Sequence, residues 1–228
     1  MRNITIIIRK QLKDTLKNKT ILIQFMLFPI MTLIMENAIT LDGMPELFFT
    51  KLFSIMYIGM APLTSVAAII AEEKEKNTLR VLMMANVKPW QYLTGVGLYV
   101  WLICMAGAGV MATGLDQEAI AFYLCIMGIG FAISVVAGAC IGIYAKNQMA
   151  ATSVVMPVML ILAFLPMIAT FNDKIEKVAK IFYTQQLKVC LENMAFTDIT
   201  KETAIVVIVN VLILIGLYGI TYKRKGLE

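Results

Sequence analysis

Residues 68–90 read AIIAEEKEKNTLRVLMMANVKPW, and they differ sharply from the sequence on either side. Five charged residues follow one another without a break at positions 72–76, whereas the whole chain is 60% hydrophobic and only 15% charged. Long apolar segments precede and follow this run. Because charged side chains are costly inside a lipid bilayer, the run predicts a short connection outside the membrane between two membrane-spanning segments.

The composition places the chain among integral membrane proteins. Its mean hydropathy is +0.80, and about a quarter of the residues of a soluble domain are charged, so much of this chain must face lipid. The net charge of +5 fits basic loops at the anionic inner leaflet better than a nucleic-acid partner. The chain has no histidine, and its four cysteines lack metal-ligand spacing. We therefore expect no catalytic site, no bound metal and no nucleic-acid partner.

Six segments are apolar over about 20 residues, the length that a helix needs to cross the hydrocarbon layer. They predict an all-α integral membrane fold with a single domain over residues 1–228. The predicted spans are residues 20–39, 48–71, 92–113, 119–145, 153–171 and 204–222. Of the 20 lysines and arginines, fourteen fall on the N-terminal side of the predicted membrane and six on the other side. The positive-inside rule therefore predicts that both termini are cytoplasmic.

Residues 1–19 predict an amphipathic helix that precedes the first span. Ile4, Ile8, Leu12 and Leu16 recur every four residues, and the lysines and arginines lie mostly off this stripe. Such a helix lies on the inner leaflet with its cations at anionic headgroups. The alternative interpretation is a polar N-terminal tail.

A short helix is expected after the charged run, beginning near Asn77 or Thr78, since both are suitable N-caps. Three apolar side chains then fall on one face by their i, i+3 and i+4 spacing, with charged residues around them. Such a face outside the membrane fits a cytosolic protein partner better than water, although a solvated connection is the alternative. The face is formed by Leu79, Leu82 and Met83, and the charge around it by Glu72, Glu73, Lys74 and Arg80.

The connection at residues 172–203 is long and carries apolar positions at helical spacing, among them Ile175, Val178 and Phe182. A connection of this length and composition is seldom a structureless loop. It predicts one or two short helices at the outer interface, with a plain surface loop as the alternative.

Two charges lie near the predicted outer ends of the first two spans. Glu36 is late in the first span and Lys51 is early in the second, so the two are placed to meet. Ionisable residues at membrane depth are costly and often functional. A structural pair at the outer interface and a role in gating or substrate contact are both open interpretations.

The fourth span carries a stripe of small residues at successive i+4 positions. Small residues let helix backbones approach closely in lipid. The stripe predicts tight packing against a helix of the same chain, with a contact between two copies as the alternative. Its members are Gly130, Ser134, Gly138 and Gly142.

Residues 71–95, AEEKEKNTLRVLMMANVKPWQYLTG, resemble the corresponding segment of bacterial type-2 ATP-binding cassette (ABC) exporter permeases. The resemblance extends over essentially the whole chain, through the six spans, the basic N-terminal helix and the helical connection before the last span. It implies that residues 1–19 are a connecting helix and that residues 72–91 couple to a separate ATPase subunit. The compact outer connections differ from those of larger exporters with outer domains.

The resemblance also implies an assembly of two permease chains, identical or paralogous, with two ATPase chains in the bacterial plasma membrane. ATP and Mg²⁺ would be bound by the ATPase, since the phosphate-binding motif G-x-x-x-x-G-K-[ST] does not occur in this sequence. Drugs, peptides and lipid-like molecules are the substrate classes that the family suggests. An ion-coupled secondary transporter or channel is the first alternative, although the spans carry little charge at mid-membrane. A non-transporting membrane scaffold is the second alternative.

Overall fold

The computed structural model describes residues 2–17, 19–39, 45–194 and 199–225, and every regular element within these ranges is helical. Six of the helices are long and apolar enough to cross a membrane, namely α2, α3, α5, α6, α7 and α10. An all-α integral membrane fold is therefore confirmed. The elements in chain order are α1 (Arg2–Lys17), α2 (Lys19–Ala38), α3 (Phe48–Glu75), α4 (Thr78–Met84), α5 (Pro89–Met111), the 3₁₀ turn η1 (Ala112–Gly114), α6 (Gln117–Tyr144), α7 (Gln148–Ala169), α8 (Asp173–Ala179), α9 (Tyr183–Asn193) and α10 (Lys201–Lys225).

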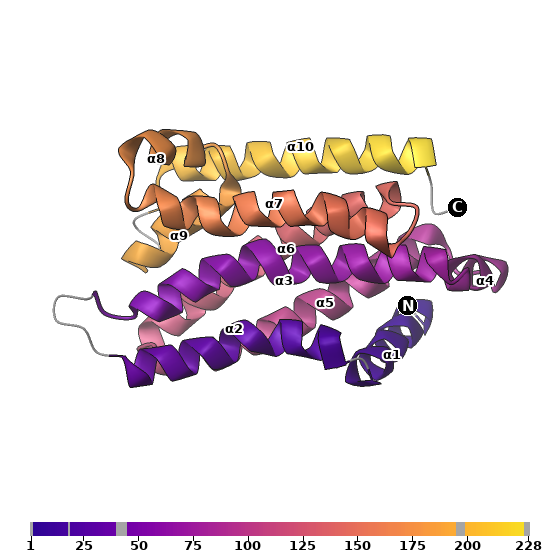
Figure 1. The fold of residues 1–228 in the computed structure, drawn as a ribbon, viewed down its shortest axis with the longest axis horizontal. Helices are drawn as coiled ribbons and strands as arrows, with labels where there is room; N and C mark the ends of the chain where they lie inside the picture. The colour runs from indigo at the N-terminus through magenta and orange to yellow at the C-terminus, as the bar shows by residue number, and fades with distance from the viewer. Residues whose placement is uncertain (1, 18, 40–44, 195–198, 226–228) are drawn as a thin grey trace.

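The long helices run alternately in opposite directions along one bundle (Figure 1). One end of the bundle carries α1, α4 and the last residues of α10, and the sequence predicts that this end faces the cytoplasm; α8 and α9 lie at the other end. We refer to these as the predicted cytoplasmic end and the predicted outer end. The observed spans match the predicted ones within a few residues, and α3 continues through the charged run to Glu75.

α3 is the central helix of the bundle. In its most apolar window 72% of the residues are buried, compared with 6% in α10. α3 packs mainly against α6 and α7, and it also contacts α2, α5 and α9. A helix surrounded in this way can transmit a displacement to most of the bundle.

The small-residue stripe of α6 packs against α3 of the same chain. A Cβ atom on Gly138 would lie 2.5 Å from the carbonyl oxygen of Leu63 in α3, a distance that no real Cβ contact tolerates. Ser134 donates a hydrogen bond to the carbonyl oxygen of Ile58 at 2.6 Å. Gly130 and Gly142 face the same helix. The stripe therefore lies against a helix of the same chain.

The N-terminal helix is confirmed as α1, and it has a second face that its stripe of apolar residues does not predict. Leu12 and Leu16 of the stripe are exposed, as a face directed at lipid requires. Ile7, Gln11 and Thr15 each come one residue before a member of this stripe, so they lie on another face of the helix. Their side chains are buried against the rest of the chain. The placement of the exposed face on the inner leaflet remains a prediction.

The buried face of α1 lies along the first turns of α5. Ile7 contacts Gly95, where an added Cβ would come within 2.9 Å of the isoleucine side chain. The hydroxyl group of Tyr99 donates a hydrogen bond to Thr15 Oγ1 at 2.5 Å. The buried face of α1 includes the polar residue Thr15 because α5 places the Tyr99 hydroxyl group against it.

The predicted helical connection before the last span is confirmed as α8 and α9. α9 is held within the bundle by Tyr183, Leu187 and Leu191, whose side chains are almost completely buried. The hydroxyl groups of Tyr183 and Ser134 lie 2.7 Å apart, which ties α9 to α6. α9 is therefore part of the bundle rather than a surface loop.

The predicted pairing of Glu36 with Lys51 is wrong. Glu36 Oε2 accepts hydrogen bonds from the amide nitrogen of Thr50 at 2.8 Å and from its hydroxyl group at 3.0 Å. The N-cap residue of α3, Leu47, offers no side-chain acceptor, and the first amides of a helix have no partner within the helix. Glu36 is therefore the anionic cap of α3, and Lys51 lies against α9, with its Nζ 3.4 Å from the carbonyl oxygen of Glu192.

Candidate functional site

The candidate site is the charged run at the predicted cytoplasmic end, residues 72–76, which we call the charged turn. It forms the last turn of α3 and the residue after it. Three of its five side chains reach other elements of the bundle, as described below. Glu72 and Lys76 instead pair with each other at 2.5 Å across one helical turn, and this pairing raises the pKa of Lys76.

Glu73 connects α3 to α1. Its carboxylate forms an ion pair with Lys10 and accepts a hydrogen bond from Gln11 Nε2 at 2.6 Å. Only 6% of Glu73 is exposed, so water contributes little to its solvation and these two partners must supply it. One of the basic residues that lie off the apolar stripe of α1 therefore binds the charged turn within this chain.

The second carboxylate oxygen of Glu73 is buried and has no hydrogen-bond partner among the described residues. The hydroxyl group of Tyr92 in α5 is also buried, and it interacts electrostatically with the Glu73 carboxylate. Unsatisfied buried polar atoms are rare in folded proteins and cost free energy. Glu73 therefore depends strongly on the position of α1, which supplies both of its close contacts.

Lys74 and Glu75 contact the ends of two further helices. Lys74 Nζ donates a hydrogen bond to the carbonyl oxygen of Ile143 at 2.8 Å, in the last turn of α6. Glu75 Oε2 accepts one from the amide of Gln148 at 2.9 Å, the first residue of α7. The cation meets the negative end of one helix dipole and the anion meets the positive end of another, so both contacts are favourable. The charged turn thus joins α3 to α1, α6 and α7.

α4 follows the charged turn directly. α4 begins at Thr78 with Asn77 as its N-cap residue, as the sequence predicts, although Asn77 adopts a left-handed backbone with a φ of 55° and its side chain makes no capping hydrogen bond. The hydroxyl group of Thr78 instead donates a hydrogen bond to the carbonyl oxygen of Glu73 at 3.1 Å. This bond ties the first residue of α4 to the end of α3 and fixes the bend between them.

The apolar residues of α4 divide into a covered face and an exposed face. Leu79 is 1% exposed and lies in the core of this chain, so the prediction that it forms part of a free face is wrong. The spacing alone does not show which element covers a face, and here the bundle itself covers it. Leu82 and Met83 are half-buried. Val81 and Met84 are 58% and 73% exposed, and we call these two residues the α4 patch.

The sequence pattern did not indicate these contacts for several residues, among them Lys10, Gln11 and Glu75. Gln11 lies outside the apolar stripe of α1, so the sequence pattern did not indicate that it is buried or that it contacts Glu73. Glu75 belongs to the quoted run, but its partner is a backbone amide that becomes available only where α7 begins. Arg80, which belongs to the charge predicted around the apolar face of α4, is exposed.

Within the described ranges, no group of three or more histidine, cysteine, aspartate or glutamate side chains is arranged to hold a metal ion. The polar groups of the charged turn are bonded to helix ends and to α1. Such an arrangement positions secondary structure; it does not present a nucleophile with an adjacent base.

Comparison with known proteins agrees with this architecture. A search of curated proteins finds no match to this sequence. The family model described as "ABC-2 family transporter protein" matches residues 2–223, from the start of α1 to the last turn of α10. Because the match covers nearly the whole chain and the six spans, the chain belongs to the ABC-2 transporter family.

Proposed function

We propose that this chain is the membrane subunit of an ATP-driven exporter in the bacterial plasma membrane. It works with a separate ATPase subunit, which binds ATP and Mg²⁺, and with a second permease chain that is identical or paralogous. A drug, a peptide or a lipid-like molecule is the proposed cargo. Membership of the ABC-2 family supports the permease role, and the contacts of the charged turn support the way in which the ATPase would act on it.

The observation that carries the proposal is the attachment of one turn of α3 to three other elements. Glu73 contacts α1, Lys74 contacts the end of α6, and Glu75 contacts the start of α7. α4 is bonded to the same turn through Thr78. A force applied to α4 by a partner therefore acts on four helices of the bundle at once, which is what coupling to an ATPase requires.

We assign different roles to the residues of the coupling segment. The α4 patch, with the half-buried Leu82 and Met83 beside it, contacts the ATPase. Leu79 anchors α4 to the bundle. The charges hold the segment in place, either within this chain or against the partner; these are Glu72, Glu73, Lys74 and Arg80.

The test is copurification with the cognate ABC ATPase subunit, co-expressed with this chain. Met84→Asp places a charge in the proposed contact, and losing a central apolar contact typically weakens an interface by about tenfold or more. We expect this variant to lose the ATPase on purification, whereas Met84→Leu, which keeps an apolar side chain of similar size, retains it. Both variants should insert into the membrane and elute as the wild-type permease does.

A second variant separates docking from coupling. Glu73→Gln leaves the α4 patch intact, so the ATPase should still copurify, but its activity in the complex should respond less to transported substrate. The proposal fails if Met84→Asp copurifies like the wild type. It also fails if the purified permease hydrolyses ATP without a partner.

A further inference from the structure

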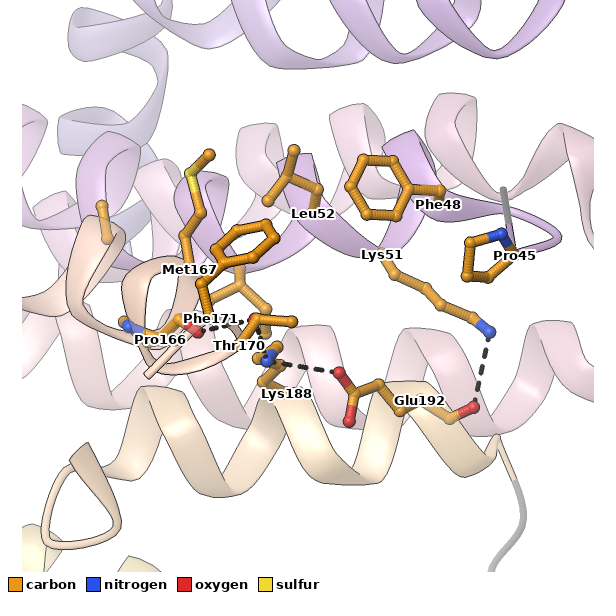
Figure 2. A pocket seen from close by; sticks show the side chains of 12 residues that line it. Pro45, Phe48, Lys51, Leu52, Pro166, Met167, Thr170, Phe171, Lys188 and Glu192 are labelled. Atoms are coloured by element: carbon orange, nitrogen blue, oxygen red, sulfur yellow. Dashed lines mark hydrogen bonds and ion pairs between the residues drawn. The ribbon is translucent and has the colours of Figure 1, made fainter. Parts of the chain in front are cut away.

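A cavity of about 330 Å³ lies at the predicted outer end, between the first turns of α3, the last turns of α7, and α9. Figure 2 shows its two sides. The apolar side includes Phe48, Leu52 and Met167, and the side toward α9 carries Lys51 and Lys188. The volume is within the range of small-molecule sites, which begins at about 300 Å³.

The charged side of the cavity has an excess of positive charge. Lys188 Nζ donates a hydrogen bond to Thr170 Oγ1 at 2.7 Å and pairs with Glu192 at 3.3 Å. Lys51 Nζ donates a hydrogen bond to the backbone carbonyl oxygen of Glu192, at 3.4 Å. No carboxylate of the described residues forms an ion pair with Lys51. Among the residues that the structure describes, two lysines thus line the cavity with one carboxylate, that of Glu192, whose side chain is 47% exposed to solvent.

The apolar side runs from the end of the bundle toward its middle. Phe48 is the first residue of α3 and Ile55 lies seven residues further on, a rise of about 10 Å along a helix. Ala163 and Pro166 of α7 line the same depth. A ligand that fills this space therefore needs a polar group at one end and an apolar group about 10 Å long behind it.

We propose that this cavity binds an anionic amphiphile, whose phosphate or carboxylate contacts Lys51 and Lys188 and whose apolar chain lies against Leu52 and Ile55. An ammonium group beside an apolar wall is poorly hydrated, so an anion that completes its hydrogen bonds is favoured. A cationic amphiphile of the same length is disfavoured by repulsion from the same two lysines. The assignment names a substrate class and thus rests on the proposed export function.

The test measures binding of dodecyl phosphate to the full-length permease, purified without ATPase and held in nanodiscs of phosphatidylcholine. We expect saturable binding that Lys51→Met weakens by about tenfold, the usual effect of losing one charge-assisted hydrogen bond. Leu52→Trp, which narrows the apolar side, should weaken binding to a similar extent. Lys177→Met removes the same charge from an exposed position on α8 and should leave binding unchanged.

Competition identifies the source of the anion. If phosphatidylglycerol in the nanodiscs displaces dodecyl phosphate, the cavity holds a bilayer lipid; if it does not, the cavity prefers single-chain amphiphiles, and both results support the anionic site. Equal binding by Lys51→Met and Lys177→Met would show non-specific partitioning and overturn the proposal. Equal competition by dodecyltrimethylammonium would overturn it as well. Because no ATPase is present, a failure here is distinct from a failure of the docking test.

Discussion

Replacing Lys10 by methionine tests whether the ion pair with Glu73 holds the N-terminal helix on the bundle. The substitution keeps an apolar stem of similar length but leaves the Glu73 carboxylate with one close partner, Gln11. Breaking a buried ion pair by removing one partner costs about 3–5 kcal/mol, whereas exposed pairs contribute less than about 1 kcal/mol. The side chain of Lys10 is 34% exposed and that of Glu73 only 8%, so we expect an intermediate loss of about 2 kcal/mol.

The measurement is thermal unfolding of the purified permease in detergent, followed by size-exclusion chromatography of the soluble fraction. For a chain of this size, 1 kcal/mol corresponds to about 2–4 °C, so Lys10→Met should lower Tm by roughly 4–8 °C. Lys13→Met is the matched control, because Lys13 lies on the same helix but is exposed. It should shift Tm by less than about 1–2 °C.

A double-mutant cycle shows whether the effect belongs to this pair. Glu73→Gln removes the negative charge while keeping an oxygen that accepts the Gln11 hydrogen bond, so it should cost less than Lys10→Met does. The double variant Lys10→Met/Glu73→Gln should then be more stable than the sum of the single losses predicts, by about 1–2 kcal/mol. If the two losses add within about 0.5 kcal/mol, or if Lys10→Met matches Lys13→Met, the pair does not fasten α1 and the reasoning is wrong.

Two further predictions concern packing and orientation. Gly138→Ala should lower the stability of the purified permease by roughly 1–3 kcal/mol, because the added Cβ meets the Leu63 carbonyl oxygen. Gly109→Ala is the control, since an added Cβ there has nothing within 4 Å, and it should leave the stability unchanged or slightly higher. Equal effects of the two variants would contradict the tight approach of α6 to α3. In a cysteine-free background, a cysteine at Lys146 should react with an impermeant maleimide only from the cytoplasm, and one at Lys177 only from outside, whereas the reverse pattern would invert the predicted topology.

The number and positions of the spans were predictable because hydrocarbon thickness and backbone hydrogen bonding leave few options for an apolar chain. The same holds for the end of α3: a run of five charges cannot remain in lipid, so the helix must leave the membrane there. The partners of those charges were not predictable to the same degree. Lys74 and Glu75 bind a carbonyl oxygen and an amide at the ends of α6 and α7, and no side-chain pattern records where free backbone groups will lie.

The two errors about individual side chains have one cause. Leu79 and Glu36 were assigned partners from spacing and charge, which describe a residue but not what covers it. Leu79 has the spacing of an exposed apolar face, yet the bundle buries it. Glu36 was expected to pair with a lysine, yet it accepts a hydrogen bond from the Thr50 amide at the amino end of α3, where Leu47 provides no side-chain cap. Free helix ends compete with charged side chains as partners, and a sequence reading that counts only side chains omits them.

The charged turn thus meets two physical requirements with the same residues. A membrane-spanning helix needs polar residues where it ends in water, and any polar residues would meet that requirement alone. The signs of the charges are specific, however: the cation Lys74 meets the carbonyl end of α6 and the anion Glu75 meets the amide end of α7, and exchanging the two would make both contacts repulsive. The order of charges in the sequence is therefore set by the directions of the neighbouring helices. A connection that only had to be soluble would carry no such order, and this is the physical reason to regard the turn as a joint between helices.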